Sequence, residues 1–352
     1  MTQLNVLVLG ASYGLLPAVR ILLAGHRVTV VCRTEEQTAL IANGASVSFL
    51  RRNGDPDMTL TVAAAHAPAG AGELGVSGTV FDVAGFDIVF CAMSEPQYAD
   101  PAVAALLRRI ASARLPVVSL MNALPPPFLV RLGTLDVDQL RPAYTSWSIW
   151  EELDPELVSA ASPDAQAVRQ SPDQPNALSV TLASNFKVAP FVRPEQQALI
   201  EMIASDVSAY RPEGRPLPVR ILAHPSLHVP LAKWPMLIAG NCRCLQPDGR
   251  AVSIADAVWA DPEVSQRIYD RVLDIVQAAG AAKHDLVPFA HYAKAASSLS
   301  RPSSFARALV NGAANIERVD RMVQLCGRTF GIELAELDVI VEQVNRVLAD
   351  RR

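Results

Sequence analysis

The sequence lacks the features of a membrane protein and of a nucleic-acid-binding protein. No apolar run approaches the roughly 20 residues that span a bilayer, and the first apolar run is stopped by Gly10, too early for a signal peptide. The net charge is −4, and no Lys/Arg-rich run creates a local positive field. We therefore expect a small-molecule substrate as the partner, with no membrane and no nucleic acid involved.

Cysteine is also scarce. The chain has five cysteines, an odd number spread over a long sequence, which favours reduced thiols in a cytoplasmic protein over a disulfide framework. Cys242 and Cys244 lie close together, but no second Cys/His pair with the spacing of a metal site accompanies them. The sequence therefore predicts a cytoplasmic protein without a metal centre.

The first part of the chain has the pattern of a doubly wound parallel sheet. Up to about residue 120, short β-branched runs alternate with helical stretches. The predicted strands are 5–9, 28–32, 87–92 and 117–121, and the predicted helices are 15–24, 35–43 and 99–113. Two further strands, 143–153 and 177–187, are expected to extend this sheet, with a solvated loop over 154–176 between them.

The second part of the chain is almost wholly helical in pattern. It follows a proline-marked segment at 211–225, and its predicted helices are 228–245, 261–280, 287–297, 303–310, 315–330 and 334–349. A length of 352 residues favours two domains. We predict an α/β N-terminal Rossmann-like domain with a doubly wound parallel sheet over 1–218, followed by an all-α C-terminal domain over 219–352.

The stretch LVLGASYG has the form of a strand, a tight turn and the start of a helix, as a pyrophosphate-binding turn requires. Gly10 supplies the tight turn and Ser12 replaces the usual second glycine. Gly14 serves as the third if the loop is one residue shorter than normal. With Tyr13 between them, these residues are our candidates for cofactor binding. GASYG also matches the G-x-S-x-G nucleophile elbow of hydrolases, and a plain strand-turn-helix is the third interpretation. The cofactor site is favoured because hydrolase sheets place several strands before the elbow.

The end of the second strand favours NADP over NAD as the cofactor. An acidic residue there would bind the ribose hydroxyls of NAD, whereas Arg33 stands where it would meet a 2′-phosphate. Glu35 and Glu36 follow only at the start of the next helix. The alternative is that Arg33 is simply solvated.

GASYG followed by LLAGHRVTVVCR resembles the opening of the ketopantoate reductase (2-dehydropantoate 2-reductase) family. Three further stretches extend the resemblance: VVSLMNALPP at 117–126, LAKWPMLIAGNCRCL at 231–245 and SRPSSFARALVNGAANIERVDRMVQLCGRTFGI at 300–332. It covers most of the chain apart from 51–80 and 154–215. It implies a Rossmann domain followed by a helical domain, with the active site in the cleft between them.

The resemblance also implies roles for single residues. Asn122 matches an asparagine near the nicotinamide and substrate, and Lys233 matches the catalytic lysine. Asn241 matches the second of two asparagines on the lysine's helix, and Ser303 and Ser304 match a pair that helps to bind the substrate carboxylate. Independently of the resemblance, Lys233 is one of only four lysines among 31 basic residues and lies in an apolar run, where desolvation would lower its pKa.

Several positions depart from the family pattern. The catalytic glutamate is replaced by Asn315, which we predict to bind the substrate. Glu317 lies two residues further on, roughly 200° around a helix at about 100° per residue. Either the local register shifts so that Glu317 enters the site, or Lys233 acts alone. A phosphate-contacting lysine of the family is absent at Ala92-Met93-Ser94. Three tryptophans could line a larger pocket or belong to the core, namely Trp147, Trp150 and Trp234.

Together, these residues predict a divergent relative of ketopantoate reductase. It would use NADPH to reduce a small 2-oxo acid or related carbonyl, with Lys233 as general acid and electrophile and with Asn122 and Glu317 as the other catalytic residues. The alternatives are a non-catalytic NADP-binding sensor, a reductase of an imine, and a hydrolase built on Ser12. A monomer and a homodimer both fit the sequence.

Overall fold

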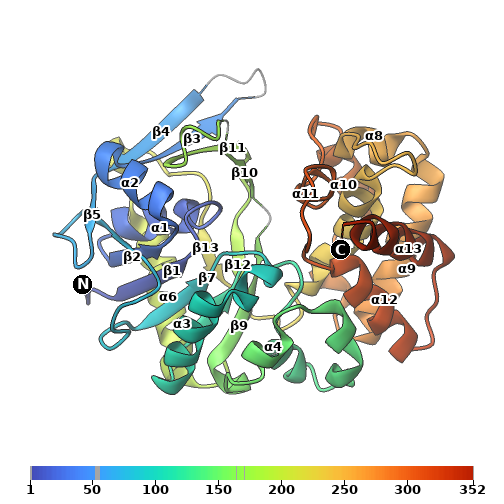
Figure 1. Cartoon of the computed structure of the whole chain (residues 1–352), viewed down its shortest axis with the longest axis horizontal. Coiled ribbons are helices and arrows are strands. Elements are labelled where there is room, and N and C mark those ends of the chain that lie inside the picture. The colour runs from blue at the N-terminus through green and yellow to red at the C-terminus, as the bar shows by residue number, and fades with distance from the viewer. Residues whose placement is uncertain (1, 52–55, 164, 170, 352) are drawn as a thin grey trace. The chain divides into compact units, whose positions relative to one another are not determined.

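A nine-stranded sheet that includes β1 (Asn5–Leu9) organises the N-terminal part of the chain (Figure 1). The computed structural model describes residues 2–51, 56–163, 165–169 and 171–351. In sheet order the strands are β13 (Ile221–Ala223), β12 (Phe186–Val188), β9 (Val158–Pro163), β8 (Val117–Ser119), β7 (Ile88–Cys91), β1, β2 (Arg27–Val31), β6 (Leu74–Ser77) and β5 (Ala64–His66).

The order of the strands is that of a doubly wound fold. β1 pairs in parallel with β2 on one side and with β7 on the other, and β7, β8 and β9 continue in parallel. Helices α1 (Leu15–Leu23), α2 (Thr34–Asn43) and α3 (Pro101–Ser112) lie along the chain between these strands. The strand order reverses between β1 and β7, and such a switch point is where dinucleotides bind in Rossmann folds.

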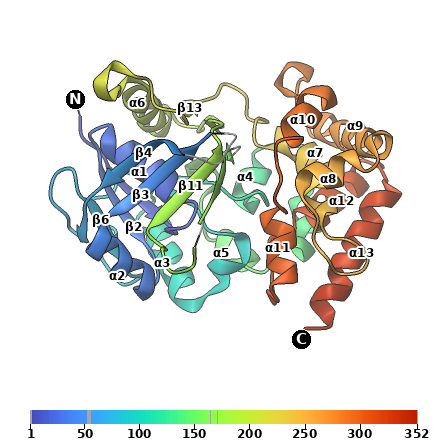
Figure 2. The ribbon, with the colours of Figure 1, turned by 90° about the horizontal axis from the view of Figure 1, so that it is seen from above.

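A second, four-stranded sheet packs against α1. Its order is β10 (Gln166–Val168), β11 (Ala177–Leu182), β3 (Ala45–Leu50) and β4 (Pro56–Val62), and Figure 2 shows β11, β3 and β4 side by side. Because α1 contacts β2 and β6 of the large sheet as well as β3 and β4, its apolar residues are buried from two sides. Pro17 is tolerated because it lies in the first turn of α1, where no intrahelical N–H bond is lost.

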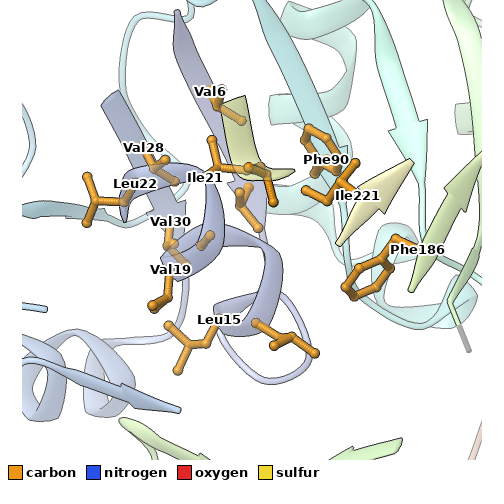
Figure 3. Close-up of a cluster of buried hydrophobic side chains, with 14 of the residues drawn as sticks. Val6, Leu15, Val19, Ile21, Leu22, Val28, Val30, Phe90, Phe186 and Ile221 are labelled. Carbon is orange, nitrogen blue, oxygen red and sulfur yellow. The ribbon is translucent and has the colours of Figure 1, made fainter. Parts of the chain in front are cut away.

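The resulting core joins residues from distant parts of the sequence (Figure 3). Side chains from β1, α1, β2, β7, β12 and β13 meet in one cluster. The figure labels Val6, Leu15, Val19, Ile21, Leu22, Val28, Val30, Phe90, Phe186 and Ile221.

Three predictions for the middle of the chain are wrong. The strand predicted over 177–187 is divided, with β11 in the second sheet and only β12 extending the large sheet. The predicted strand over 143–153 is replaced by a 3₁₀ helix (Val137–Ala143) and the short helix α5 (Trp147–Trp150), because a short apolar run suits a buried helical turn as well as a strand. The predicted loop over 154–176 contains β9, all of whose residues are buried, and β10. The sequence pattern does not reveal β9, because apolar and polar residues do not alternate among its small residues VSAASP. Helix α6 (Pro194–Ala209) is a further element that the sequence pattern did not reveal.

Arg20 ties α6 and the segment that follows it to α1. Its side chain is fully buried, and it donates hydrogen bonds to the carbonyl of Val219 (2.9 Å) and to that of Val207 (3.3 Å). Burial lowers the pKa of the Arg20 guanidinium to about 10, so the group stays charged at neutral pH. The buried charge is therefore stabilised by two backbone carbonyls.

Replacing Arg20 by methionine is expected to lower the free energy of unfolding by about 2–4 kcal/mol, because two buried carbonyls lose their donor while the side-chain length is kept. Urea denaturation of the wild type and of Arg20→Met measures this. The control Arg27→Met removes an exposed arginine close by and should change the stability by less than about 0.5 kcal/mol. Equal losses in the two variants would contradict this role of Arg20.

The second compact unit is helical. The first unit comprises Met1–Met93, Gln97–Phe128 and Ser148–Leu227, and the second comprises Ser94–Pro96, Leu129–Trp147 and His228–Arg352. In this division the first unit ends at Leu227, and residues 129–147 belong to the helical unit. Its main helices are α8 (Ile254–Trp259), α9 (Pro262–Ala278), α10 (Phe289–Ala296), α11 (Ser304–Val310), α12 (Val319–Thr329) and α13 (Ala335–Ala349), and the short α4 (Pro126–Val130) crosses from one unit to the other. In the described ranges, no helix has the length and apolar character needed to cross a membrane.

Candidate active site

The glycine-rich turn after β1 admits no side chain at either of its glycines. Gly10 has φ +104°, and a Cβ there would lie 2.6 Å from Met93 Cγ. Gly14 begins α1 at φ −63°, and a Cβ there would lie 2.1 Å from the Gly10 carbonyl oxygen and 2.9 Å from Val8 Cγ1. Gly10 therefore provides the tight turn, and Gly14 allows α1 to approach β1, which are the first and third glycine roles in a dinucleotide-binding turn.

The same turn lies at the switch point of the sheet. The N–H of Gly10 donates to Val31 O of β2 (2.9 Å), and the N–H of Ala92, after β7, donates to Leu9 O (2.9 Å). Ser12 is exposed in the turn that leads into α1, and the N–H groups of Leu15 and Leu16 donate to the carbonyls of Ser12 (3.4 Å) and Tyr13 (3.2 Å) within this turn. A turn of this kind at the N-terminus of a helix is a favourable place for an anion. These residues fit the pyrophosphate of a dinucleotide.

The backbone at Ser12 does not support the nucleophile elbow. That motif places its serine on a strained strand-to-helix turn. In the described part of the chain, the non-glycine residues with positive φ are Arg114 and Val219, and Ser12 is not one of them.

Tyr13 has a structural role in the turn. Its hydroxyl donates to the carbonyl of Ala165 (2.9 Å), and its ring makes an edge contact with Phe186 at 5.7 Å between centroids. The hydrogen of the Tyr13 hydroxyl is therefore used within the protein.

The end of β2 carries a cluster of three charged side chains. Arg33 caps α2, and its side chain is 74% exposed. The Glu36 side chain is 7% exposed; its Oε2 accepts from the Arg33 N–H (3.0 Å), and its Oε1 lies 3.2 Å from Arg33 Nη2 and 2.7 Å from Arg169 Nη2. Burial alone would raise the pKa of Glu36, but the hydrogen bonds from the two arginines outweigh burial and lower that pKa. Sequence reasoning missed Arg169, because no local pattern connects it to β2.

Asn122 lies at the same sheet edge as Gly10. It follows β8, which runs parallel to β7, and β7 runs parallel to β1, so that the carboxyl ends of these strands share one edge. Asn122 is half-buried in the turn that leaves this edge. That is the edge where ligands of doubly wound sheets bind.

Lys233 lies in an irregular helical segment rather than in one regular helix. The predicted helix over 228–245 consists of a 3₁₀ turn (Leu231–Lys233), the short α7 (Trp234–Met236), a π-helical stretch (Leu237–Asn241) and a second 3₁₀ turn (Cys242–Cys244). Pro235 lacks the N–H that a regular helix would use, and π-helical stretches are frequent at functional sites. Lys233 is half-buried beside the buried Trp234.

All three tryptophans considered for a larger pocket, Trp147, Trp150 and Trp234, are buried. They belong to the packing of their units. Cys242 and Cys244 are buried free thiols, and no group of three or more potential metal ligands occurs among the residues that the structure describes.

Ser303 and Ser304 differ in their surroundings. Ser303 is buried; its hydroxyl donates to the carbonyl of Asn241 (2.7 Å) and accepts from the N–H of Ala306 (3.1 Å), so that it caps α11 and ties α11 to the Lys233 segment. Ser304 is exposed in the first turn of α11. Of the two hydroxyls, that of Ser304 is therefore the more accessible to a carboxylate.

Replacing Ser303 by alanine is expected to cost about 1–2 kcal/mol of stability, since one hydroxyl serves both as the helix cap and as the tie to Asn241. Ser304→Ala, its neighbour, should change the stability by less than about 0.5 kcal/mol. Thermal unfolding of the two variants separates the roles, and equal stabilities would contradict this assignment.

Glu317 and Asn315 precede helix α12 instead of lying on it. Helix α12 begins at Val319 with Arg318 as its cap, so the rotation of about 200° expected between the two residues does not apply. Asn315 is exposed, whereas Glu317 is half-buried. Burial raises the pKa of Tyr144 and that of the Cys242 thiol, and the nearby charge of Glu317 raises both further. Glu317 thus lies near the end of the Lys233 segment.

Glu95 is a buried carboxyl that sequence reasoning missed. Its Oε1 accepts hydrogen bonds from the N–H groups of Thr145 (2.8 Å) and Ser146 (2.6 Å) and from the Ser146 hydroxyl (2.7 Å). Its Oε2 is also buried and has no hydrogen-bond partner within the described chain. Burial raises the pKa of Glu95, although these hydrogen bonds lower it in part. Glu95 therefore holds the 145–146 turn within the helical unit.

Comparisons with known proteins find solved structures that share this fold. No protein-family model matches the chain, and no curated protein matches it. Among solved structures, a ketopantoate reductase from Ralstonia eutropha JMP134 is 16% identical, with 99% of each chain covered and a TM-score of 0.69. A 2-dehydropantoate 2-reductase from Methylococcus capsulatus is 13% identical, covering 99% of this chain and 98% of its own, with a TM-score of 0.63.

A third similar structure is D-mandelate dehydrogenase with NADH and anilino(oxo)acetate. It is 11% identical, 99% of each chain is covered, and the TM-score is 0.65. The chain therefore has the fold of the ketopantoate reductases, an N-terminal Rossmann-like domain followed by an α-helical C-terminal domain.

Proposed function

We propose that this protein is a nicotinamide-dependent reductase of small 2-oxo acids, a divergent relative of ketopantoate reductase. The geometry of the turn after β1 carries the proposal. Gly10 at φ +104° and the lack of space for a side chain at Gly14 are specific requirements of a dinucleotide-binding turn, and they occur at the switch point of the sheet. A plain strand-turn-helix needs neither.

The cofactor is proposed to be NADP. NAD is bound through its ribose hydroxyls by a free carboxylate after β2. Here the oxygens of Glu36 already accept from Arg33 and lie against Arg169, while the Arg33 side chain is largely exposed and able to meet a 2′-phosphate. The NADH in the D-mandelate dehydrogenase structure belongs to a protein that is only 11% identical.

The proposed chemistry divides between named groups. The bound cofactor supplies a hydride. Lys233 hydrogen-bonds the carbonyl oxygen of the substrate through its ammonium group and gives it a proton, which stabilises the charge that develops there. Glu317 is the carboxyl that restores the proton to Lys233. It is favoured over Asn315 because an amide cannot transfer a proton and because Asn315 is exposed.

The remaining predicted residues are proposed to bind and orient the substrate and the cofactor. Asn122 is proposed to hold the substrate and the nicotinamide at the edge of the sheet. Asn241 and Ser304 bind the substrate carboxylate, and Ser303 keeps their two segments together. The substrate is proposed to be a small 2-oxo acid because similar structures are named for ketopantoate and mandelate chemistry. The proposal places the protein in the cytoplasm, as a monomer or a homodimer.

Initial rates of NADPH oxidation test the proposal. The panel consists of ketopantoate, the phenyl-substituted 2-oxo acid that corresponds to mandelate, and pyruvate. Turnover of any of them establishes the reductase, and the order of kcat/KM ranks the substrate classes. If the protein binds NADPH without turnover on the panel, an imine reductase or a sensor replaces the proposal. If it binds no nicotinamide nucleotide, the proposal fails.

A further inference from the structure

The segment Ala165–Arg169 contacts the candidate cofactor site at two places. At one end, the carbonyl of Ala165 accepts from the hydroxyl of Tyr13 in the glycine-rich turn (2.9 Å). At the other end, Arg169 Nη2 lies 2.7 Å from Glu36 Oε1 at the end of β2. The segment includes β10 of the second sheet and lies in the part of the chain that the resemblance to ketopantoate reductases does not cover. It therefore borders both the glycine-rich turn and the charged cluster of Arg33 and Glu36 at the end of β2. We call this cluster the ribose corner, because the ribose of the cofactor is proposed to bind there.

Arg169 changes the charge of the ribose corner. Arg33 and Glu36 alone would form a neutral pair, in which the carboxylate cancels the guanidinium that faces solvent. With Arg169, these three side chains have two positive charges and one negative charge, a net charge of +1, and the exposed Glu35 is a further carboxylate whose charge acts on Arg33. A dianionic phosphate is attracted to the cluster of three and not to the neutral pair.

The burial of the cluster makes this charge effective. The side chain of Arg169 is 18% exposed and that of Glu36 is 7% exposed, so both are fixed and only weakly screened by solvent. The Nε of Arg169 is buried and has no hydrogen-bond partner among the residues that the structure describes. Its hydrogen-bonding capacity is therefore not exhausted by Glu36. The side chain of Arg33 is 74% exposed, so it is accessible to a ligand from solvent.

We propose that Arg169 is a second specificity-determining residue for the 2′-phosphate of the cofactor, and that Glu36 positions it beside Arg33. This inference rests on the proposed function, since it concerns the cofactor of that same site. Arg169 neutralises Glu36, which leaves the charge of Arg33 available to the phosphate. Without Arg169, Glu36 would counter Arg33, and the preference for a phosphorylated ribose would be lost.

Equilibrium binding tests this without any need for turnover. The dissociation constants of NADPH, NADH and adenosine 2′,5′-bisphosphate are measured for the wild type, Arg169→Met and Arg33→Met by calorimetry or fluorescence. Methionine keeps much of the side-chain length and removes the charge. We expect Arg169→Met to raise the dissociation constants of NADPH and of the bisphosphate by about 10–100-fold, the effect of losing a charge-assisted contact. The dissociation constant of NADH should change by less than about threefold.

Arg51→Met is the matched control. Arg51 follows β3 in the same four-stranded sheet and pairs with the exposed Asp57, so its loss should leave all three constants unchanged. Thermal unfolding confirms that each variant is folded, and Arg169→Lys, which keeps the charge, should recover part of the NADPH affinity. If the binding of NADPH and that of NADH weaken equally in Arg169→Met, or if neither weakens, Arg169 has only a structural role and the inference is overturned. If the wild type binds neither nucleotide, the proposed function is overturned as well.

Discussion

Replacement of Lys233 by alanine is expected to lower kcat/KM for 2-oxo acid reduction by about 10²–10⁴-fold. The carbonyl oxygen would lose both its proton donor and the positive charge beside it, and the half-buried position of Lys233 leaves little room for water to replace them. The dissociation constant of NADPH should stay within about threefold of the wild type, because the residues proposed to bind the nucleotide lie in the other unit. Steady-state kinetics on the best substrate of the panel and a fluorescence titration with NADPH measure the two effects.

Lys294→Ala provides the comparison for this variant. Lys294 is exposed on α10 of the same unit, and its removal should leave kcat/KM within about twofold. A Lys233→Ala enzyme that keeps more than a tenth of the wild-type kcat/KM would exclude Lys233 as the proton donor. Weaker NADPH binding without a loss of kcat would instead make Lys233 a cofactor-binding residue.

Replacement of Gly14 by alanine is expected to impair nucleotide binding by at least tenfold and to lower the free energy of unfolding by about 1–3 kcal/mol. The new Cβ would lie 2.1 Å from the carbonyl oxygen of Gly10, a backbone atom that moves only with the turn itself. The start of α1 must then shift away from β1, and its N–H groups leave the position that the pyrophosphate needs. Urea denaturation and NADPH titration record the two effects.

Gly78→Ala is the control for Gly14→Ala. A Cβ at Gly78 would meet its nearest neighbour, Gln37 Nε2, at 3.6 Å, which is an ordinary contact with a flexible side chain. This variant should be as stable as the wild type within about 1 kcal/mol. If Gly14→Ala binds NADPH with wild-type affinity, the turn after β1 does not hold the pyrophosphate.

Much of the first unit follows from local patterns in the sequence. The strands of the central sheet are short β-branched runs, and the pattern alternates with helices as a doubly wound sheet requires. The glycine at position 10 indicates the tight turn, and the structure gives it a positive φ. These features depend on neighbours in the sequence, because backbone conformation and amphipathicity are local properties.

The candidate site was only partly predictable, because part of its geometry depends on contacts that are not local in the sequence. Lys233 could be selected from its rarity and its apolar surroundings, but its 3₁₀ and π-helical setting could not be foreseen, since Pro235 allows several local geometries. The sequence pattern predicts a helix over 315–330, whereas α12 begins at Val319, so the predicted helical relation between Asn315 and Glu317 is wrong. Serines at the start of a helix look alike in sequence, and only the contact with Asn241 distinguishes Ser303 from Ser304.

Local sequence patterns are sufficient to predict the two-part architecture, the glycine-rich turn and the candidate lysine. Which charged side chains meet depends on how the chain folds. The fold brings Arg169 from the second sheet against Glu36 after β2, and it buries Glu95 against the turn at Ser146. Such pairs form because a desolvated carboxylate requires donors from whatever segment the fold places beside it, and no periodicity along the chain records that neighbour.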